Sequence, residues 1–160
     1  MRELRNKMPV TVVLDRVRSL YNVGSIFRTS DAFCVETIYL CEITGCPPHP
    51  EIHKTALGAE DTVTWKYCKS TLQALEELRE EGYVLCAVEQ TENSVYMDSW
   101  TPEQEKKYAF VFGNEVKGVQ PQAVDYCDCC IEIAQYGAKR SLNVSVAAAL
   151  IIYYVFNKLK

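Results

Sequence analysis

Three stretches of the sequence place polar and charged side chains next to glycines, where a polar ligand could bind. They are residues 14–33, 110–119 and 138–156. Arginine offers a fork of N–H donors to phosphate, asparagine and serine can orient hydroxyl groups, and glycine lets the backbone approach a ligand closely. Each stretch also has an ordinary structural explanation as a loop, a turn or a helix start.

The first stretch, LDRVRSLYNVGSIFRTSDAF, contains a turn at Asn22 and Gly24, followed by the start of an amphipathic helix. Arg28 comes one helical turn after Gly24, so we expect it near the N-terminal end of that helix. An exposed arginine at a loop–helix junction is common and needs no ligand to explain it. A dinucleotide-binding turn is excluded, because the spacing G-x-G-x-x-G does not occur in the sequence.

The second stretch, FVFGNEVKGV, brackets Asn114, Glu115 and Lys117 between Gly113 and Gly118. This spacing matches the beginning of a phosphate-binding P-loop, which must continue with lysine and then serine or threonine. Valine and glutamine follow here, so the nucleoside-triphosphatase interpretation fails. A strand–turn–helix connection with a solvent-exposed glutamate is the simpler alternative.

The third stretch is AKRSLNVSVAAALIIYYVF (residues 138–156), and its apolar run indicates a buried helix with a polar start. Ser141 could cap this helix by accepting a backbone N–H, which leaves Asn143 and Ser145 unexplained. Buried polar groups need partners, because burial without a hydrogen bond costs about 1–3 kcal/mol. A bound polar ligand or the neighbouring loops could supply those partners.

Short apolar runs alternate with helical patterns along the chain. Strands are predicted at residues 10–14, 37–41, 83–88, 108–112 and 130–134, and helices at 22–33, 70–82, 120–126 and 146–156. The alternation predicts an α/β fold with a mainly parallel sheet flanked by helices. Ligands of such sheets bind beyond the carboxyl ends of the strands, and each of the three stretches follows a predicted strand.

Length, composition and charge limit the class of protein. The 160 residues fit a single domain over residues 1–160, with a short N-terminal arm at residues 1–9. No apolar run is long enough to cross a membrane and no secretory signal is evident, so a cytoplasmic location is expected. Because the formal net charge is −4, any contact with nucleic acid must use a local basic patch, such as Lys139 and Arg140.

Cysteines and histidines raise the question of a metal site. Eight cysteines in a chain of this length are too few for a disulfide scaffold. Cys41, Cys46, His49 and His53 could meet at a zinc ion, but the second half of such a site is missing from the local sequence. We therefore expect a Pro-rich surface loop with polar histidines, and no metal.

Taken together, NVGSIFRTSDAF, FGNEVKGV and IEIAQYGAKRSLNVSVAAAL resemble the three signature motifs of the SpoU/TrmH family of SPOUT methyltransferases. Their order and spacing also match, so the resemblance covers essentially the whole chain. It implies an α/β fold with a deep C-terminal trefoil knot, an exception to the rule that chains are unknotted. It also implies S-adenosyl-L-methionine as cofactor, a ribose 2′-hydroxyl of tRNA or rRNA as methyl acceptor, and a homodimer with a composite site. The chain resembles the minimal, single-domain members.

The same resemblance implies roles for individual residues. The expected catalytic residues are Arg28 and Asn22 from the first motif, Glu115 from the second, and Ser141 and Asn143 from the third. The expected cofactor-binding residues are Gly113, Asn114, Gly118, Ile131, Ile133, Ser141 and Leu142. Because the pKa of arginine is above about 12, we expect Arg28 to clamp phosphate or ribose rather than to act as a base. Glu115 would orient Arg28 or help to accept the proton.

Two departures from the family pattern stand out. Cys34 occupies a position where the family often has glycine, and we expect it to affect packing only. Glu132 replaces the proline of the usual Ile-Pro-Met segment, which we expect to alter cofactor affinity.

Two other functions remain open. One is a non-catalytic RNA-binding module that retains the fold, against which the intact motif residues argue. The other is a small-molecule-binding α/β domain for a nucleotide, which the failed phosphate motifs disfavour.

Overall fold

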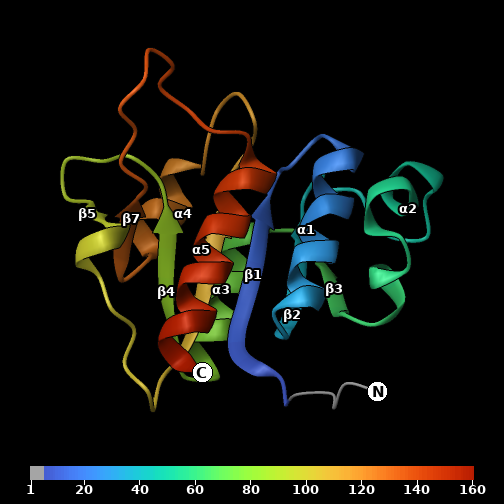
Figure 1. Ribbon diagram of the computed structural model, residues 1–160, viewed down its shortest axis with the longest axis horizontal. Helices are drawn as coiled ribbons and strands as arrows, with labels where there is room; N and C mark the ends of the chain where they lie inside the picture. Colours follow the sequence, from blue (N-terminus) through green and yellow to red (C-terminus); the bar gives the residue numbers. More distant parts are fainter. Residues whose placement is uncertain (1–5) are drawn as a thin grey trace.

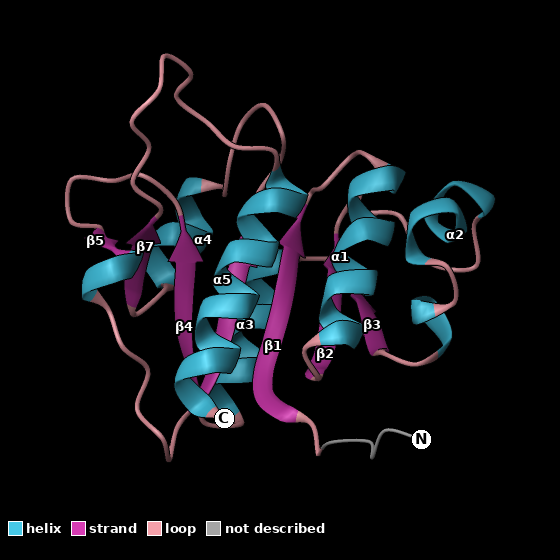
Figure 2. Ribbon diagram, in the orientation of Figure 1, coloured by secondary structure: helices cyan, strands magenta, loops and turns pink. Residues whose placement is uncertain are grey.

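A parallel sheet of seven strands, covered by helices on both faces, forms the centre of the protein (Figures 1 and 2). The computed structural model describes residues 6–160. The strands are β1 (Met8–Asp15), β2 (Val35–Cys41), β3 (Thr64–Cys68), β4 (Tyr83–Val88), β5 (Val95–Tyr96), β6 (Lys107–Phe112) and β7 (Cys129–Glu132). Their order across the sheet is β3-β2-β1-β6-β4-β7-β5, and all neighbouring strands run parallel. The predicted fold class is confirmed, while the trefoil knot stays a prediction.

The helices are α1 (Leu20–Ala32), α2 (Pro50–Ala56), α3 (Thr71–Glu80), α4 (Pro121–Tyr126) and α5 (Val144–Leu159), with short 3₁₀ turns η1 (Ala59–Asp61) and η2 (Met97–Ser99). In Figure 1, α1 and α5 lie in front of the sheet, α3 and α4 lie behind it, and α2 lies beside α1 at the sheet's edge. The predicted strands and helices are all present, with ends shifted by a few residues.

Three elements were not predicted: the edge strands β3 and β5, and the helix α2. The loop expected around the two histidines is in part α2, whose N-cap is His49. The expected arm is also shorter than residues 1–9, because β1 begins at Met8. Residues 1–5 lie outside the described residues.

Side chains of the sheet alternate between two hydrophobic cores, as expected for strands buried on both faces. In β1, Val12 and Leu14 pack with the core beneath α1 and α5, whereas Val13 packs with the core beneath α3 and α4. The central strands are therefore packed on both faces, and the loops at their carboxyl ends start from this buried sheet.

The last helix is less buried than its sequence indicates. Val146, Leu150 and Tyr153 lie one or two turns apart on α5 and are 47%, 40% and 56% exposed. The helix expected to be buried is therefore buried on one side, and α5 also presents one apolar stripe to its surroundings. Among residues 6–160, no helix has the length and apolar character needed to span a membrane.

Candidate functional site

A cavity of about 490 Å³ lies at the carboxyl ends of β4, β6 and β7, beside the first turn of α5. This is the edge at which parallel α/β sheets bind ligands, and the volume suits a ligand of nucleotide size. Most of the site residues predicted from the sequence line it: Gly113, Asn114, Glu115, Gly118, Ile131, Ile133, Ser141, Leu142 and Asn143. The structure thus brings the second and third stretches together.

The loop after β6 owes its shape to two glycines. A Cβ atom at Gly113 would lie 2.1 Å from the carbonyl carbon of Gly118, and Gly118 has a φ of +72°. The backbone N–H of Asn114 donates to the carbonyl of Gly118 (3.0 Å), and the N–H of Gly118 donates to that of Asn114 (2.8 Å). A side chain is disfavoured at both glycines, so Gly113 and Gly118 present bare backbone to the cavity.

The Asn114 side chain also has a structural role. Its Nδ2 donates to the carbonyl of Arg16 (2.8 Å), and its Oδ1 accepts the N–H groups of Val116 and Lys117. Asn114 therefore closes the loop and attaches it to the chain that follows β1.

Glu115 connects the second stretch to the first. Its carboxylate accepts hydrogen bonds from the backbone N–H groups of Arg18 and Ser19, both 2.8 Å, and from Nδ2 of Asn22 (3.0 Å). Burial alone would raise the pKa of Glu115, but these hydrogen bonds outweigh it and hold the pKa below its ordinary value. Glu115 is thus an ionised anchor for the start of α1, which makes it a poor proton acceptor.

Arg28 lies outside this cavity. Because α1 begins at Leu20, Arg28 is two turns into the helix rather than near its N-terminal end, so that expectation was wrong. Arg28 lines a separate, more open depression of about 430 Å³ between α1 and α2, next to Ser25 and Thr29. Its expected contact with Glu115 is not found in the described part of the chain, where Glu115 is bound by the start of α1.

The start of α5 also differs from expectation. Asn143, not Ser141, caps the helix: its Oδ1 accepts the backbone N–H of Ser145 (2.8 Å) and the hydroxyl of Ser145 (2.6 Å). Two of the polar residues at this helix start thus satisfy each other. Ser141 is exposed and lines the cavity.

Two further cavity residues, Glu132 and Gln90, lie on the side of β4 and β7. Glu132 accepts a hydrogen bond from the Ser94 hydroxyl (2.6 Å), which joins β7 to the loop after β4. Gln90 donates from Nε2 to the carbonyl of Arg140 (3.2 Å), which joins the same loop to the segment before α5.

Glu89 was not identified from the sequence. Its Oε2 accepts the N–H of Val119 (2.9 Å), and its Oε1 accepts the N–H of Gln90 (3.2 Å). A Cβ atom at Gly118 would meet Oε2 of Glu89 at 2.4 Å. The sequence did contain a signal for it: Glu89 is an acidic residue directly after the apolar run YVLCAV, at the carboxyl end of a predicted strand where ligands bind.

The histidines have partners other than a metal ion. Nδ1 of His49 accepts the N–H of Glu51 (3.1 Å), and Nδ1 of His53 lies 2.6 Å from Oε1 of Glu60. Across residues 6–160, no group of three or more histidine, cysteine or acidic side chains is placed to hold a metal ion.

Comparison with known proteins agrees with this architecture. Residues 9–153 match the SpoU rRNA Methylase family. A relative from Staphylococcus haemolyticus, named for the TrmH family of tRNA/rRNA methyltransferases, is 30% identical over 151 residues, or 94% of this chain and 59% of its own. The chain therefore spans about three-fifths of the length of such curated relatives.

Solved structures show the same fold. A TrmH/SpoU tRNA modifying enzyme from A. aeolicus has a TM-score of 0.85 and 29% identity, covering 96% of this chain and 76% of that one. An AdoMet-bound rRNA methyltransferase from Sinorhizobium meliloti has a TM-score of 0.86 and 24% identity, covering 99% and 63%. Because the family match extends over most of the sequence and the fold agrees, the chain belongs to the SpoU rRNA methylase family.

Proposed function

We propose that the chain binds S-adenosyl-L-methionine in the cavity and transfers its methyl group to a ribose 2′-hydroxyl of tRNA or rRNA. The convergence of the second and third motif segments around one cavity, with the first attached through Asn22 and Glu115, carries this proposal. Membership of the family and the AdoMet bound by the Sinorhizobium neighbour support the choice of cofactor.

The residues around the cavity fit an adenosyl cofactor. Gly113 and Gly118 expose backbone, while Ile131 and Leu142 offer apolar walls for an adenine ring. Glu89 offers acceptors for the hydroxyl and amino donors of such a ligand. When bound, the cofactor supplies a methyl group on a positively charged sulfur, activated for transfer to an oxygen nucleophile.

A homodimer would supply the missing arginine. Arg28 does not line the cavity of its own chain, so we place it at the cavity of a second copy. The apolar stripe of Val146, Leu150 and Tyr153 on α5 is a suitable interface. It lies beside α1, because the Phe33 ring packs edge-on against Tyr153 with centroids 5.3 Å apart.

Within this arrangement each motif residue has a distinct role. Arg28 binds a phosphate or the ribose and stabilises the negative charge that develops on the attacking oxygen. Asn22 and Glu115 position the start of α1 through their mutual hydrogen bond. Ser141 is free to contact the ligands, and Asn143 fixes the end of the loop from which Ser141 projects.

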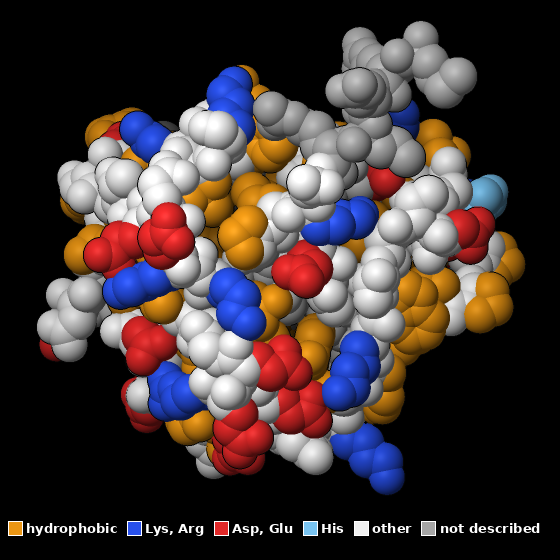
Figure 3. Space-filling view, turned by 90° about the horizontal axis from the view of Figure 1, so that it is seen from below, with side chains coloured by type: hydrophobic (Ala, Val, Ile, Leu, Met, Phe, Trp, Pro, Cys, Tyr) orange, Lys and Arg blue, Asp and Glu red, His pale blue; other side chains and the backbone are white. Residues whose placement is uncertain are grey.

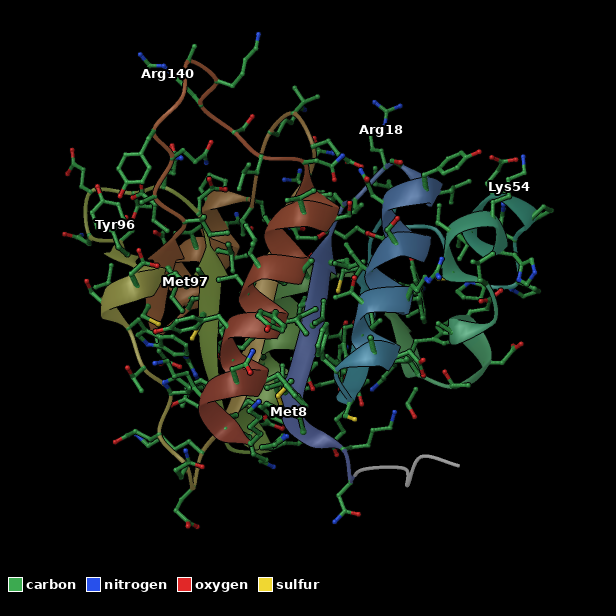
Figure 4. The ribbon with its side chains drawn as sticks, in the orientation of Figure 1. Met8, Arg18, Lys54, Tyr96, Met97 and Arg140 are labelled. Atoms are coloured by element: carbon green, nitrogen blue, oxygen red, sulfur yellow. The ribbon has the colours of Figure 1, made fainter. Side chains whose placement is uncertain are left out.

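The RNA would approach the carboxyl edge of the sheet. Figure 4 shows Arg18, before α1, and Arg140, before α5, both pointing away from the protein at this edge. On the opposite face, where the strands begin, acidic and basic side chains are interspersed (Figure 3). Basic side chains at the cavity edge position a phosphate backbone but carry little sequence information.

The test is methyl transfer from labelled S-adenosylmethionine to purified tRNA and rRNA, followed by nuclease digestion and mass spectrometry of the nucleosides. We expect a 2′-O-methylated nucleoside. A methylated base would overturn the ribose assignment, and RNA binding without transfer would favour the non-catalytic module. Calorimetry with S-adenosylmethionine and with ATP tests the third alternative, because a general nucleotide-binding domain would bind ATP.

A further inference from the structure

Glu89 places a carboxylate in the cavity wall where β4 ends. Each carboxylate oxygen has two acceptor positions, and the structure uses one on each: Val119 N–H on Oε2 and Gln90 N–H on Oε1. The side chain is only partly buried and lines the cavity, so acceptor capacity remains for a ligand.

The carboxylate is also held in one place. Oε2 packs against Gly118, where a Cβ atom would lie 2.4 Å away, and the N–H of Val119 donates to the same oxygen. In the part of the chain that the structure describes, no lysine, arginine or histidine forms an ion pair with Glu89. Glu89 is thus a positioned, negatively charged acceptor with no cationic partner of its own.

The other acidic residues of the cavity are engaged differently. Both oxygens of Glu115 are bound by the start of α1, and Oε1 of Glu132 accepts the Ser94 hydroxyl. In α/β nucleotide-binding proteins, an acidic side chain in the crevice beyond the strand ends accepts hydrogen bonds from ribose hydroxyls. Glu89 occupies the corresponding kind of position.

We propose that Glu89 accepts hydrogen bonds from the ribose hydroxyl groups of the adenosyl cofactor, and so selects a ribonucleoside over a deoxyribonucleoside at this site. The inference rests on the cofactor assigned under the proposed function. It does not depend on which RNA atom receives the methyl group. Glu89 would be a cofactor-specificity residue that also holds the turn at Gly118.

The experiment is calorimetry of the whole chain with three probes: S-adenosylhomocysteine, its 2′-deoxyribose analogue, and its inosine analogue, which lacks the adenine amino group. Wild type is expected to bind the 2′-deoxy analogue about tenfold more weakly, as loss of one hydrogen bond to a charged group predicts. Glu89→Gln keeps an oxygen for Val119 N–H but removes the charge, so this ratio should fall below about threefold. Glu89→Ala should bring it close to one.

Glu92→Gln is the matched control, because it neutralises an exposed carboxylate of the same loop that does not line the cavity, and it should leave the tenfold ratio unchanged. A thermal unfolding scan shows whether each variant is folded; should Glu89→Ala not fold, Glu89→Gln alone decides. If Glu89→Gln weakens the binding of S-adenosylhomocysteine and of its 2′-deoxyribose analogue equally, the ratio is unchanged. Glu89 then acts on the turn alone, and the proposal is overturned. Loss of discrimination against the inosine analogue instead would place Glu89 at the adenine and also overturn it. If wild type does not bind S-adenosylhomocysteine, the cofactor assignment itself falls, and the Glu89 proposal falls with it.

Discussion

Nδ2 of Asn22 donates a hydrogen bond of 3.0 Å to Oε2 of Glu115, which joins α1 to the loop after β6 across 93 residues of sequence. The same carboxylate accepts the backbone N–H groups of Arg18 and Ser19. Residues of two separate motifs therefore hold each other in place. This contact positions α1, and with it Arg28, relative to the cavity.

The first prediction concerns the pH dependence of this contact. The pKa of Glu115 is lower in the folded protein than its ordinary 4.5, so ionised Glu115 stabilises the fold above that pH. The contribution is lost as the pH falls through the folded-state pKa. At pH 7, Glu115→Gln should lower the free energy of unfolding by about 1 kcal/mol, a modest value because the side chain is exposed.

Urea unfolding of both proteins at neutral and at acidic pH checks this. The difference should shrink towards zero once Glu115 is protonated in both states. Glu105→Gln, at an exposed residue outside these contacts, is the control and should change little. A difference that stays constant at acidic pH would show that charge is not the cause.

Arg28→Ala should separate methyl transfer from cofactor binding. The side chain lies away from the cavity of its own chain, so cofactor affinity by calorimetry should stay within about twofold of wild type. The rate of transfer to RNA should fall by at least about a hundredfold, the usual effect of removing a donor that stabilises developing charge. Loss of cofactor binding would contradict the assignment of Arg28 to the RNA side.

A composite site predicts rescue between two inactive variants. Gly113→Ala should not bind cofactor, because its Cβ would lie 2.1 Å from Gly118 backbone. Mixed with Arg28→Ala, it should restore about a quarter of the wild-type rate. Random exchange makes half of the dimers mixed, and each mixed dimer has one intact site of two.

The control for this rescue lies on the apolar stripe. Leu150→Glu introduced into both variants places charges at the proposed interface, so sedimentation should show monomers and rescue should disappear. Rescue that survives in a monomer, or no rescue in a dimer, would refute the composite site.

Cys34 gives a prediction about stability. It follows the C-cap of α1 with a φ of +59°, a conformation that suits glycine. In the left-handed conformation, a residue with a Cβ is strained by about 1–2 kcal/mol. Glycine avoids this strain, but it lowers stability by about 0.4–1 kcal/mol because it gives the unfolded chain more conformational freedom. Cys34→Gly should therefore stabilise the protein by up to about 1 kcal/mol in thermal unfolding. Cys34→Ala, which keeps the Cβ, should show no such gain.

The elements that the sequence predicts well are those whose signal is local. The apolar runs of the central strands and the spaced leucines of α3 are set by burial, which leaves a direct pattern. The edge strand β3 was missed because Thr64, Lys66 and Tyr67 are exposed, so it has no apolar run. In β5, only two residues pair with β7. Neither β3 nor β5 therefore has a local sequence pattern from which a strand could be predicted.

The cavity residues were predicted largely through motif resemblance, and the errors arose mainly at helix ends, where several nearby polar residues can serve as the cap. Sequence alone did not show that Asn143 rather than Ser141 caps α5, because either residue type could. Arg28 was misplaced because α1 begins two residues before the predicted start, at the Ser19 cap. The role of Cys34 was underestimated, since its backbone angle depends on how α1 leads into β2.

The position of β1 in the middle of the sheet has a consequence for synthesis. Val12 pairs with Phe110 of β6, and the two are separated by roughly a hundred residues. A growing chain can pair β1 with β2 early, but the other edge of β1 stays exposed until β6 leaves the ribosome. Pairing across such a distance is slow because the loop must close first. We therefore expect refolding of this chain on the scale of milliseconds to seconds or longer, with assembly of the cavity among its last steps.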